Sequence, residues 1–143
     1  MKKKYLIATH GYFAKGLQSA LEILADKGKE VTVINAYVDD SDYLPEVESF
    51  ISSVDEAEIA YIFTDLFGGS VNQNVVRILA ESQKQNIKLI TNTNLAIILS
   101  IIFSDKDILT DQEIDELLLE SAVRSIHLTT NNDEEAFFRR YFL

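Results

Sequence analysis

The sequence predicts a single α/β domain in which a mainly parallel sheet is covered by helices on both faces. Four segments with the pattern of a strand followed by a helix recur at intervals of about 28 residues, which is typical of parallel sheets with crossover helices. The third strand, residues 59–64, is apolar nearly throughout, as expected for a strand buried on both faces. With 143 residues, of which 47% are hydrophobic, the chain can bury a core of its own.

The first unit combines a strand over residues 4–9 with a helix. Phe13 and Leu17 open a series of apolar residues at helical spacing, so we expect the helix to begin near Phe13. Gly28 is expected to close it, because glycine is the preferred residue just after a helix end. The second strand follows at 30–36, where β-branched residues are frequent.

The second and third helices each begin with a recognisable pattern. Asp42 is expected to cap the second helix, with Pro45 in its first turn. After the strand at 59–64 comes the sequence Asp-Leu-Phe-Gly-Gly-Ser. Ser70 and Gln73 have the spacing of a capping box, in which each side chain satisfies a free amide, so the third helix is expected to begin at Ser70.

The remaining elements are a fourth strand, two helices and a last strand. The fourth strand is predicted at 87–91, and the apolar run 95–103 is assigned to a helix by its position in the series, since periodicity does not decide. Thr110 and Glu113 form a second capping box that opens an acidic helix. Residues 125–130 are predicted to be the last strand.

Composition and charge exclude several kinds of partner and chemistry. Thirteen basic against 23 acidic side chains give a formal net charge of -10, which argues against binding to nucleic acid or anionic lipid. The chain has no cysteine, so disulfides, thiolate nucleophiles and thiolate metal sites are excluded. Every apolar run is shorter than the roughly 20 residues that cross a bilayer, and the N-terminal apolar segment is too short for a signal peptide. We therefore expect a cytoplasmic protein without membrane insertion.

The candidate chemistry lies where the predicted strands end. Ligands of open parallel sheets bind beyond the carboxyl ends of the strands, at the point where the strand order reverses. His10 follows the first strand, and in a chain without cysteine a neutral imidazole is the natural nucleophile. Asp65 follows the third strand and can accept the proton of one ring nitrogen, which leaves the other nitrogen free to attack.

The loop after Asp65 suits an anion such as a phosphoryl group. Gly68 and Gly69 allow backbone amides to come close, and the helix that starts at Ser70 adds its dipole and a hydroxyl donor. We assign Gly11, on the neighbouring strand end, to the same phosphoryl-binding group. The site rim is predicted to contain four further residues: Thr9, Leu66, Phe67 and Asn94.

Structural interpretations of the same residues remain open at this point. A histidine at a strand end is often a partly buried hydrogen-bonding residue, and the loop could be a tight turn followed by a helix cap. His127 lies inside an apparent strand, where a structural role is favoured. His10 and Asp65 lack a third evident ligand, so we predict no metal and no cofactor.

Several motifs together resemble the IIA family of mannose-type sugar phosphotransferase systems. They are Ala-Thr-His-Gly at 8–11, Ala-Lys-Gly-Leu at 14–17, Thr-Asp-Leu-Phe-Gly-Gly-Ser at 64–70 and Asn-Leu at 94–95. The resemblance implies a phosphotransferase in which the Nε2 atom of His10 receives a phosphoryl group while Asp65 holds Nδ1. The donor would be the phosphorylated histidine carrier protein of the system, and the acceptor a IIB subunit.

The resemblance also implies an assembly and a division of the chain. The family forms homodimers in which the final strand, here 125–130, crosses to the edge of the partner's sheet as an antiparallel strand. Residues 1–130 would form the carrier domain and residues 131–143 a C-terminal tail.

Three positions depart from the family pattern, and two other functions remain open. Val71 and Ala96 stand where the family usually has proline, and Asn92 stands where glycine is usual. Asparagine tolerates the left-handed conformation better than most residues, so the last change is mild. The alternatives are a phosphoryl carrier for dihydroxyacetone kinase and a regulatory module that binds partners according to its phosphorylation state.

Overall fold

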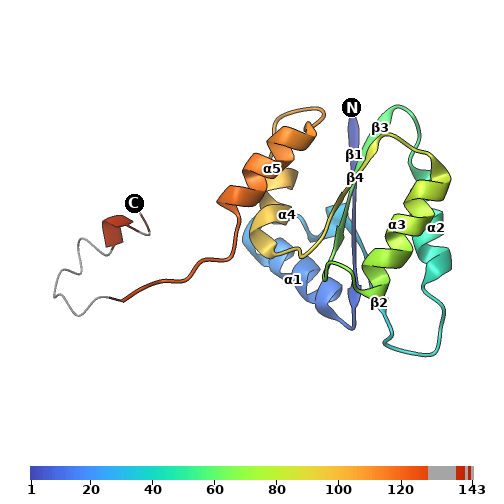
Figure 1. Ribbon diagram of the computed structural model, residues 1–143, viewed down its shortest axis with the longest axis horizontal. Helices are drawn as coiled ribbons and strands as arrows, with labels where there is room; N and C mark the ends of the chain where they lie inside the picture. The colour runs from blue at the N-terminus through green and yellow to red at the C-terminus, as the bar shows by residue number, and fades with distance from the viewer. Residues whose placement is uncertain (129–137, 141, 143) are drawn as a thin grey trace.

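A sheet of four parallel strands forms the centre of the protein, with the strand order β2-β1-β3-β4 (Figure 1). The computed structural model describes residues 1–128, 138–140 and 142. The strands are β1 (Lys2–His10), β2 (Val31–Ala36), β3 (Glu58–Thr64) and β4 (Ile87–Ile90).

Helices cover both faces of the sheet, as the sequence predicts. They are α1 (Phe13–Ala25), α2 (Leu44–Ser53), α3 (Ser70–Ser82), α4 (Leu95–Ile102) and α5 (Asp111–Glu120), with a short 3-10 turn, η1 (Gly28–Glu30). In the view of Figure 1, α1, α4 and α5 lie to the left of the sheet, whereas α2 and α3 lie to the right. The predicted single α/β domain with a parallel sheet is thus confirmed.

The side chains on the two faces of the sheet belong to two separate apolar cores. On β1, Tyr5 and Ile7 pack with α1, α4 and α5, whereas Leu6 and Ala8 pack with α2 and α3. This division follows from the period of two along a strand. All seven residues of β3 are buried, which explains why residues 59–63 within it are all apolar.

The strand order reverses between β1 and β3. The chain goes outward from β1 to the edge strand β2 and then returns to the other side of β1, so that β1 and β3 are neighbours. Their register pairs Ala8 with Thr64, which brings His10 and Asp65 to adjacent strand ends. This is the position at which open parallel sheets bind ligands.

The first helix ends before the predicted glycine. Its last residue is Ala25, and Asp26 takes the left-handed conformation, with φ 57°, that terminates it. Gly28 instead begins η1, and a Cβ atom added there would lie 2.9 Å from the Cβ of Glu22. Glycine is therefore required at this position by close packing, which the sequence pattern did not distinguish from a helix end.

The second helix begins two residues after the predicted cap. Its N-cap is Tyr43, which makes no capping bond with its side chain, and Pro45 lies in the first turn as predicted. The Oδ1 atom of Asp42 accepts a hydrogen bond from the Leu44 amide at 3.0 Å. Asp42 thus closes a turn that leads into the helix.

Two other predictions about helices are confirmed. The apolar run from 95 forms α4, whose residues Ile97, Ile98 and Ile101 are buried. Thr110 and Glu113 form both bonds of the capping box at the start of α5.

The described residues of the predicted last strand, 125–128, do not form a strand. Residues 123–128 have no regular secondary structure and lead away from the body of the protein in Figure 1, while residues 129 and 130 lie outside the described residues. The predicted domain boundary at 130, and most of the predicted tail, also lie outside them. Among the helices of the described part, none is long and apolar enough to span a membrane.

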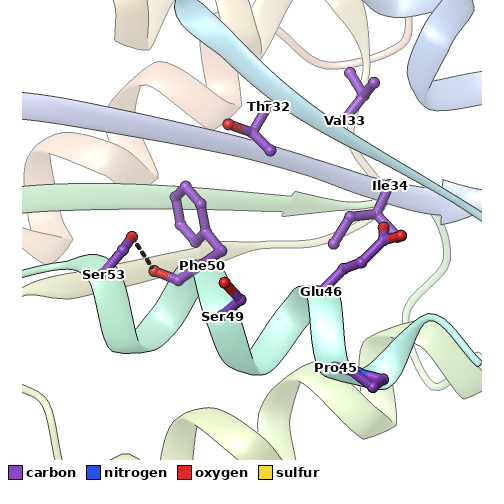
Figure 2. A pocket seen from close by; sticks show the side chains of 8 residues that line it. All are labelled: Thr32, Val33, Ile34, Pro45, Glu46, Ser49, Phe50 and Ser53. Carbon is purple, nitrogen blue, oxygen red and sulfur yellow. Dashed lines mark hydrogen bonds between the residues drawn. The ribbon is translucent and has the colours of Figure 1, made fainter.

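A shallow groove runs between the edge strand β2 and α2 (Figure 2). Ile34 and Phe50 form its apolar side, and Ser53 donates a hydrogen bond to the Phe50 carbonyl at 2.6 Å. None of the predicted site residues lines this groove.

Candidate functional site

His10 and Asp65 contact each other across the ends of β1 and β3. The Nδ1 atom of the imidazole lies 2.9 Å from Oδ2 of Asp65, and the backbone amide of His10 donates to the same oxygen at 2.9 Å. The His10 side chain is 41% exposed and that of Asp65 only 14%. The nucleophile predicted from the sequence is thus accessible, while the carboxylate that orients it is largely enclosed.

The contact fixes the tautomer of the neutral ring. Burial tends to raise the pKa of Asp65, but hydrogen bonds from the amide and ring of His10 outweigh it and lower the pKa below its usual range. The carboxylate is therefore ionised at neutral pH and can only accept hydrogen bonds, so Nδ1 must carry the proton. The unprotonated nitrogen is then Nε2, on the exposed side of the ring.

Ser70 faces this nitrogen and does not cap its helix, so the predicted capping box is wrong here. The N-cap of α3 is Gly69, and no side chain completes a capping bond. The Oγ atom of Ser70 lies 3.3 Å from Nε2 of His10 and 2.8 Å from the Tyr37 hydroxyl. Gln73 also points elsewhere, since its side chain donates to the carbonyl of Gly68 at 2.6 Å. The serine hydroxyl therefore contacts His10 and Tyr37, and the first turn of α3 has no side-chain cap.

The three predicted glycines shape the loops, and their amides donate within the protein. Gly11 and Gly68 adopt left-handed conformations, with φ 59° and 78°. The Gly11 amide donates to the carbonyl of Ala36 at 2.8 Å, and that of Gly69 to the carbonyl of Leu66 at 3.0 Å. Gly69 also passes close to the imidazole, since an added Cβ would lie 3.4 Å from its Cε1 atom.

The start of α3 supplies the amides that can hold an anion. The first intrahelical bond of α3 runs from the Gln73 amide to the Gly69 carbonyl at 2.9 Å. The amides of Ser70, Val71 and Asn72 precede it and have no partner within the helix, as in every first turn. Together with the helix dipole they favour a negative charge beside Nε2.

The loop that carries Leu66 and Phe67 is held by Asn92, which follows β4. These two side chains are 58% and 74% exposed, as expected of residues on the rim. Asn92 has φ 49°, in agreement with the tolerance expected of asparagine, and its Oδ1 atom accepts a hydrogen bond from the Phe67 amide at 2.7 Å. The side chain that replaces the usual glycine thus helps to hold the loop.

Thr9 and Asn94 make structural contacts near the site. Thr9 is fully buried, and its hydroxyl accepts a hydrogen bond from the Ala14 amide at 2.7 Å, which holds the start of α1. Asn94 caps α4 by accepting from the Ile97 amide at 2.8 Å and donates to the Ser121 carbonyl at 2.7 Å. Both lie at the predicted sheet edge, but their bonds stabilise the scaffold.

Tyr37 is a site residue that the sequence analysis did not select. It follows β2, at the same sheet edge as His10, and its ring centroid lies 5.4 Å from that of the imidazole. Its hydroxyl contacts Ser70 at 2.8 Å and Tyr43 at 3.4 Å. Its position at a strand end was the available signal, but nothing in the local sequence indicates its left-handed backbone, with φ 65°.

The described part of the chain holds no cluster of three or more histidine, aspartate or glutamate side chains that could bind a metal ion. What the site does contain is one imidazole, one ionised carboxylate, a set of neutral hydroxyls and a helix start. This arrangement can present a nucleophilic nitrogen to a phosphoryl group and hold the transferred anion with neutral donors.

Comparison with known proteins gives a consistent result. The family model EIIA-man, described as the PTS system fructose IIA component, matches residues 4–118. A structure from Klebsiella pneumoniae, described as a phosphoenolpyruvate-dependent sugar phosphotransferase system permease, is 29% identical with a TM-score of 0.68, over 85% of this chain and 84% of that one. No match was found among the curated proteins.

Two more distant structures share the fold. The mannose/sorbose-specific IIA subunit from Enterococcus faecalis is 19% identical with a TM-score of 0.70, over 92% of this chain and all of that one. The phosphotransferase system component EIIA from Streptococcus agalactiae is 23% identical with a TM-score of 0.66, over 83% of this chain and 91% of that one.

Proposed function

The chain belongs to the EIIA-man family of IIA components of sugar phosphotransferase systems, and from that premise we propose that it is a phosphoryl relay that carries the group on His10. The observation that supports this most strongly is the 2.9 Å contact between Nδ1 of His10 and Asp65 beside an exposed Nε2. A structural histidine would not need a largely enclosed carboxylate on one nitrogen and an open approach to the other.

In the proposed reaction the phosphoryl group moves between two nitrogen atoms. The lone pair of Nε2 attacks the phosphorus of a donor phosphohistidine, the donor's N–P bond breaks, and its electron pair returns to the donor ring. The new Nε2–P bond leaves the His10 ring with a positive charge, because Nδ1 keeps its proton. The ionised Asp65 stabilises that charge, and no proton needs to leave the site.

The donors around Nε2 suit a relay because they are neutral. The amides of Ser70, Val71 and Asn72 and the Ser70 hydroxyl can stabilise the charge on the phosphoryl oxygens during transfer. A site that bound the phosphorylated state too tightly would slow the onward step, since only preferential stabilisation of the transition state raises the rate. Neutral dipoles provide stabilisation without a cation that would retain the group.

We further propose the partners and the assembly that the family resemblance implies. The donor is the phosphorylated histidine carrier protein and the acceptor is a histidine of a IIB subunit, both reached in the cytoplasm. Leu66 and Phe67, in the loop that follows Asp65, are exposed and can contact either partner. The chain acts as a homodimer in which residues 125–130 add an antiparallel strand to the partner's sheet.

The proposal is tested by phosphorylation in a purified system. The chain is incubated with phosphoenolpyruvate, enzyme I and the carrier protein, and the acid-labile label is measured before and after addition of a IIB subunit. Wild type should be labelled and should pass the label on, and His10→Ala should remain unlabelled. His127→Ala is the matched control, since His127 is the only other histidine. Unchanged labelling of His10→Ala would rule out the relay.

A further inference from the structure

A row of hydroxyl groups leads from the interior to the reactive nitrogen of His10. The Asn74 side chain donates to the Tyr43 hydroxyl at 2.8 Å, and the hydroxyls of Tyr43 and Tyr37 lie 3.4 Å apart. The Tyr37 hydroxyl lies 2.8 Å from Ser70, and Ser70 lies 3.3 Å from Nε2. The row begins at Asn74, in the second turn of α3, and ends at Ser70, the first residue of the same helix.

The tautomer of His10 decides the direction of these hydrogen bonds. Since Nε2 is unprotonated, the Ser70 hydroxyl must donate to it, and the serine oxygen is then free to accept from Tyr37. Tyr37 in turn can accept from Tyr43, whose oxygen accepts from Asn74. Burial raises the pKa of Tyr43 to about 12, so this hydroxyl keeps its proton at neutral pH. Every hydroxyl in the row therefore donates toward the imidazole.

The backbone of Tyr37 is strained in a way that places its ring on His10. A φ of 65° is unfavourable for a bulky aromatic residue, and such conformations persist only where the surroundings enforce them. The two rings are inclined by 32° with centroids 5.4 Å apart. The Tyr37 side chain remains 57% exposed, so its position is not explained by burial in the core.

We propose that Tyr37 is a positioning residue of the relay: its hydroxyl aims Ser70 at Nε2, and its ring confines the imidazole from one side. This inference rests on the proposed function of His10. When Nε2 becomes phosphorylated it can no longer accept a hydrogen bond, so the Ser70 hydroxyl turns to a phosphoryl oxygen. Tyr37 can donate to the serine oxygen in both states, so the serine hydroxyl stays directed at the reacting nitrogen and then at the phosphoryl group.

The test is a double-mutant cycle on the rate of phosphorylation by the carrier protein. Tyr37→Phe keeps the ring and removes the hydroxyl, and it should slow transfer roughly 3- to 10-fold, the effect of one hydrogen bond. In a Ser70→Ala background the same change should have no further effect, because Tyr37 acts through Ser70. Tyr12→Phe, at an exposed tyrosine two residues after His10, is the matched control and should leave the rate unchanged.

A spectroscopic measurement separates positioning from a general loss of structure. Tyr37→Phe should shift the ¹⁵N resonance of His10 Nε2 in the unphosphorylated protein, leave that of Nδ1 nearly unchanged and leave Tm unchanged. Tyr37→Asn, which tolerates the left-handed backbone, should keep or raise Tm while slowing transfer at least as much. An unchanged transfer rate in Tyr37→Phe would overturn the inference. So would an equal slowing by Tyr37→Phe in the wild-type and the Ser70→Ala backgrounds.

Failure of this inference can be told apart from failure of the relay. If His10→Ala is still labelled, the relay is wrong, but the ¹⁵N shift still reports whether Tyr37 orients Ser70. If the label is on His10 and Tyr37→Phe behaves as wild type in rate and ¹⁵N spectrum, only the role of Tyr37 is wrong.

Discussion

His10 donates twice to one oxygen of Asp65, from its backbone amide and from Nδ1 of its ring, each at 2.9 Å. The two bonds tie the orientation of the ring to the end of the strand that carries it. Within the described part of the chain, the other carboxylate oxygen, Oδ1, is buried without a hydrogen-bond partner. Both bonds that Oδ2 accepts thus come from His10.

Replacement of Asp65 by asparagine should impair transfer while the fold remains. The amide side chain is neutral, so it no longer stabilises the positive phosphorylated ring and no longer enforces a proton on Nδ1. By analogy with the carboxylates that orient metal-bound histidines, we expect phosphorylation to slow about 10- to 100-fold. Quenched-flow labelling measures the rate, and Asp42→Asn, whose carboxylate serves the turn before α2, is the control. A wild-type rate in Asp65→Asn would contradict the assigned role.

The pKa of Asp65 should respond to removal of the imidazole. Its pKa is lowered from the ordinary value of 3.8 by hydrogen bonds from His10 that outweigh burial. In His10→Ala the ring bond is lost while the burial remains, so the pKa of Asp65 should rise. Titration of the side-chain carboxyl by ¹³C NMR measures this shift, and an unchanged value would contradict it.

The same pairing has a consequence for stability in acid. A folded-state pKa that is lower than the unfolded one stabilises the protein above the unfolded value of 3.8, and this contribution is lost as the pH falls through the folded pKa. On acidification below about pH 4, wild type should therefore lose more free energy of unfolding than Asp65→Asn. Urea unfolding at a series of pH values measures the difference. Parallel acid dependence of the two proteins would argue against it.

Ser70 and Thr110 should respond oppositely to alanine, although both open a capping-box pattern in the sequence. Ser70 makes no capping bond, so Ser70→Ala should slow phosphorylation but change the free energy of unfolding by less than about 0.5 kcal/mol. Thr110→Ala removes a true cap and should cost about 1 kcal/mol without affecting the rate. Chemical denaturation and labelling of both variants provide the comparison. Equal destabilisation by the two changes would contradict the assignment of Ser70 to the site.

Alanine substitutions at the two adjacent glycines of the loop should affect stability and transfer rate differently. Gly68 has φ 78° and open space around it, so Gly68→Ala should cost about 1 kcal/mol of stability through backbone strain. Gly69 has no such strain, but a methyl group there would meet the Leu66 carbonyl oxygen at 3.2 Å and His10 at 3.4 Å. Gly69→Ala should therefore slow transfer more than Gly68→Ala does. The reverse order of rates would show that Gly69 is not close to the reacting nitrogen.

The sequence was sufficient to predict the fold and the contact between His10 and Asp65, for identifiable reasons. The period of the apolar residues determines which segments are strands and helices, and consecutive parallel units bring every strand end to one edge. His10 and Asp65 lie at two such ends, and the 2-1-3-4 strand order makes those ends neighbours. The prediction of their contact needed only topology.

Features that depend on tertiary contacts could not be predicted in the same way. Ser70 fits the sequence pattern of a capping box. In the folded protein its hydroxyl instead contacts His10 and Tyr37, which the fold brings to it from the ends of two other strands. Gly28 resembles a helix end, and only the packing of Glu22 shows why it must be glycine. Residues 125–128 have the composition of a strand, but no strand in the described part of the chain pairs with them.

The most direct test of the central claim is the identity of the phosphorylated nitrogen. ³¹P and ¹⁵N NMR of the phosphorylated chain distinguishes the two phosphohistidine isomers. Because Asp65 holds the proton on Nδ1, the phosphoryl group should be on Nε2 of His10, with Nδ1 still protonated. A phosphoryl group on Nδ1, or on any residue other than His10, would contradict the account.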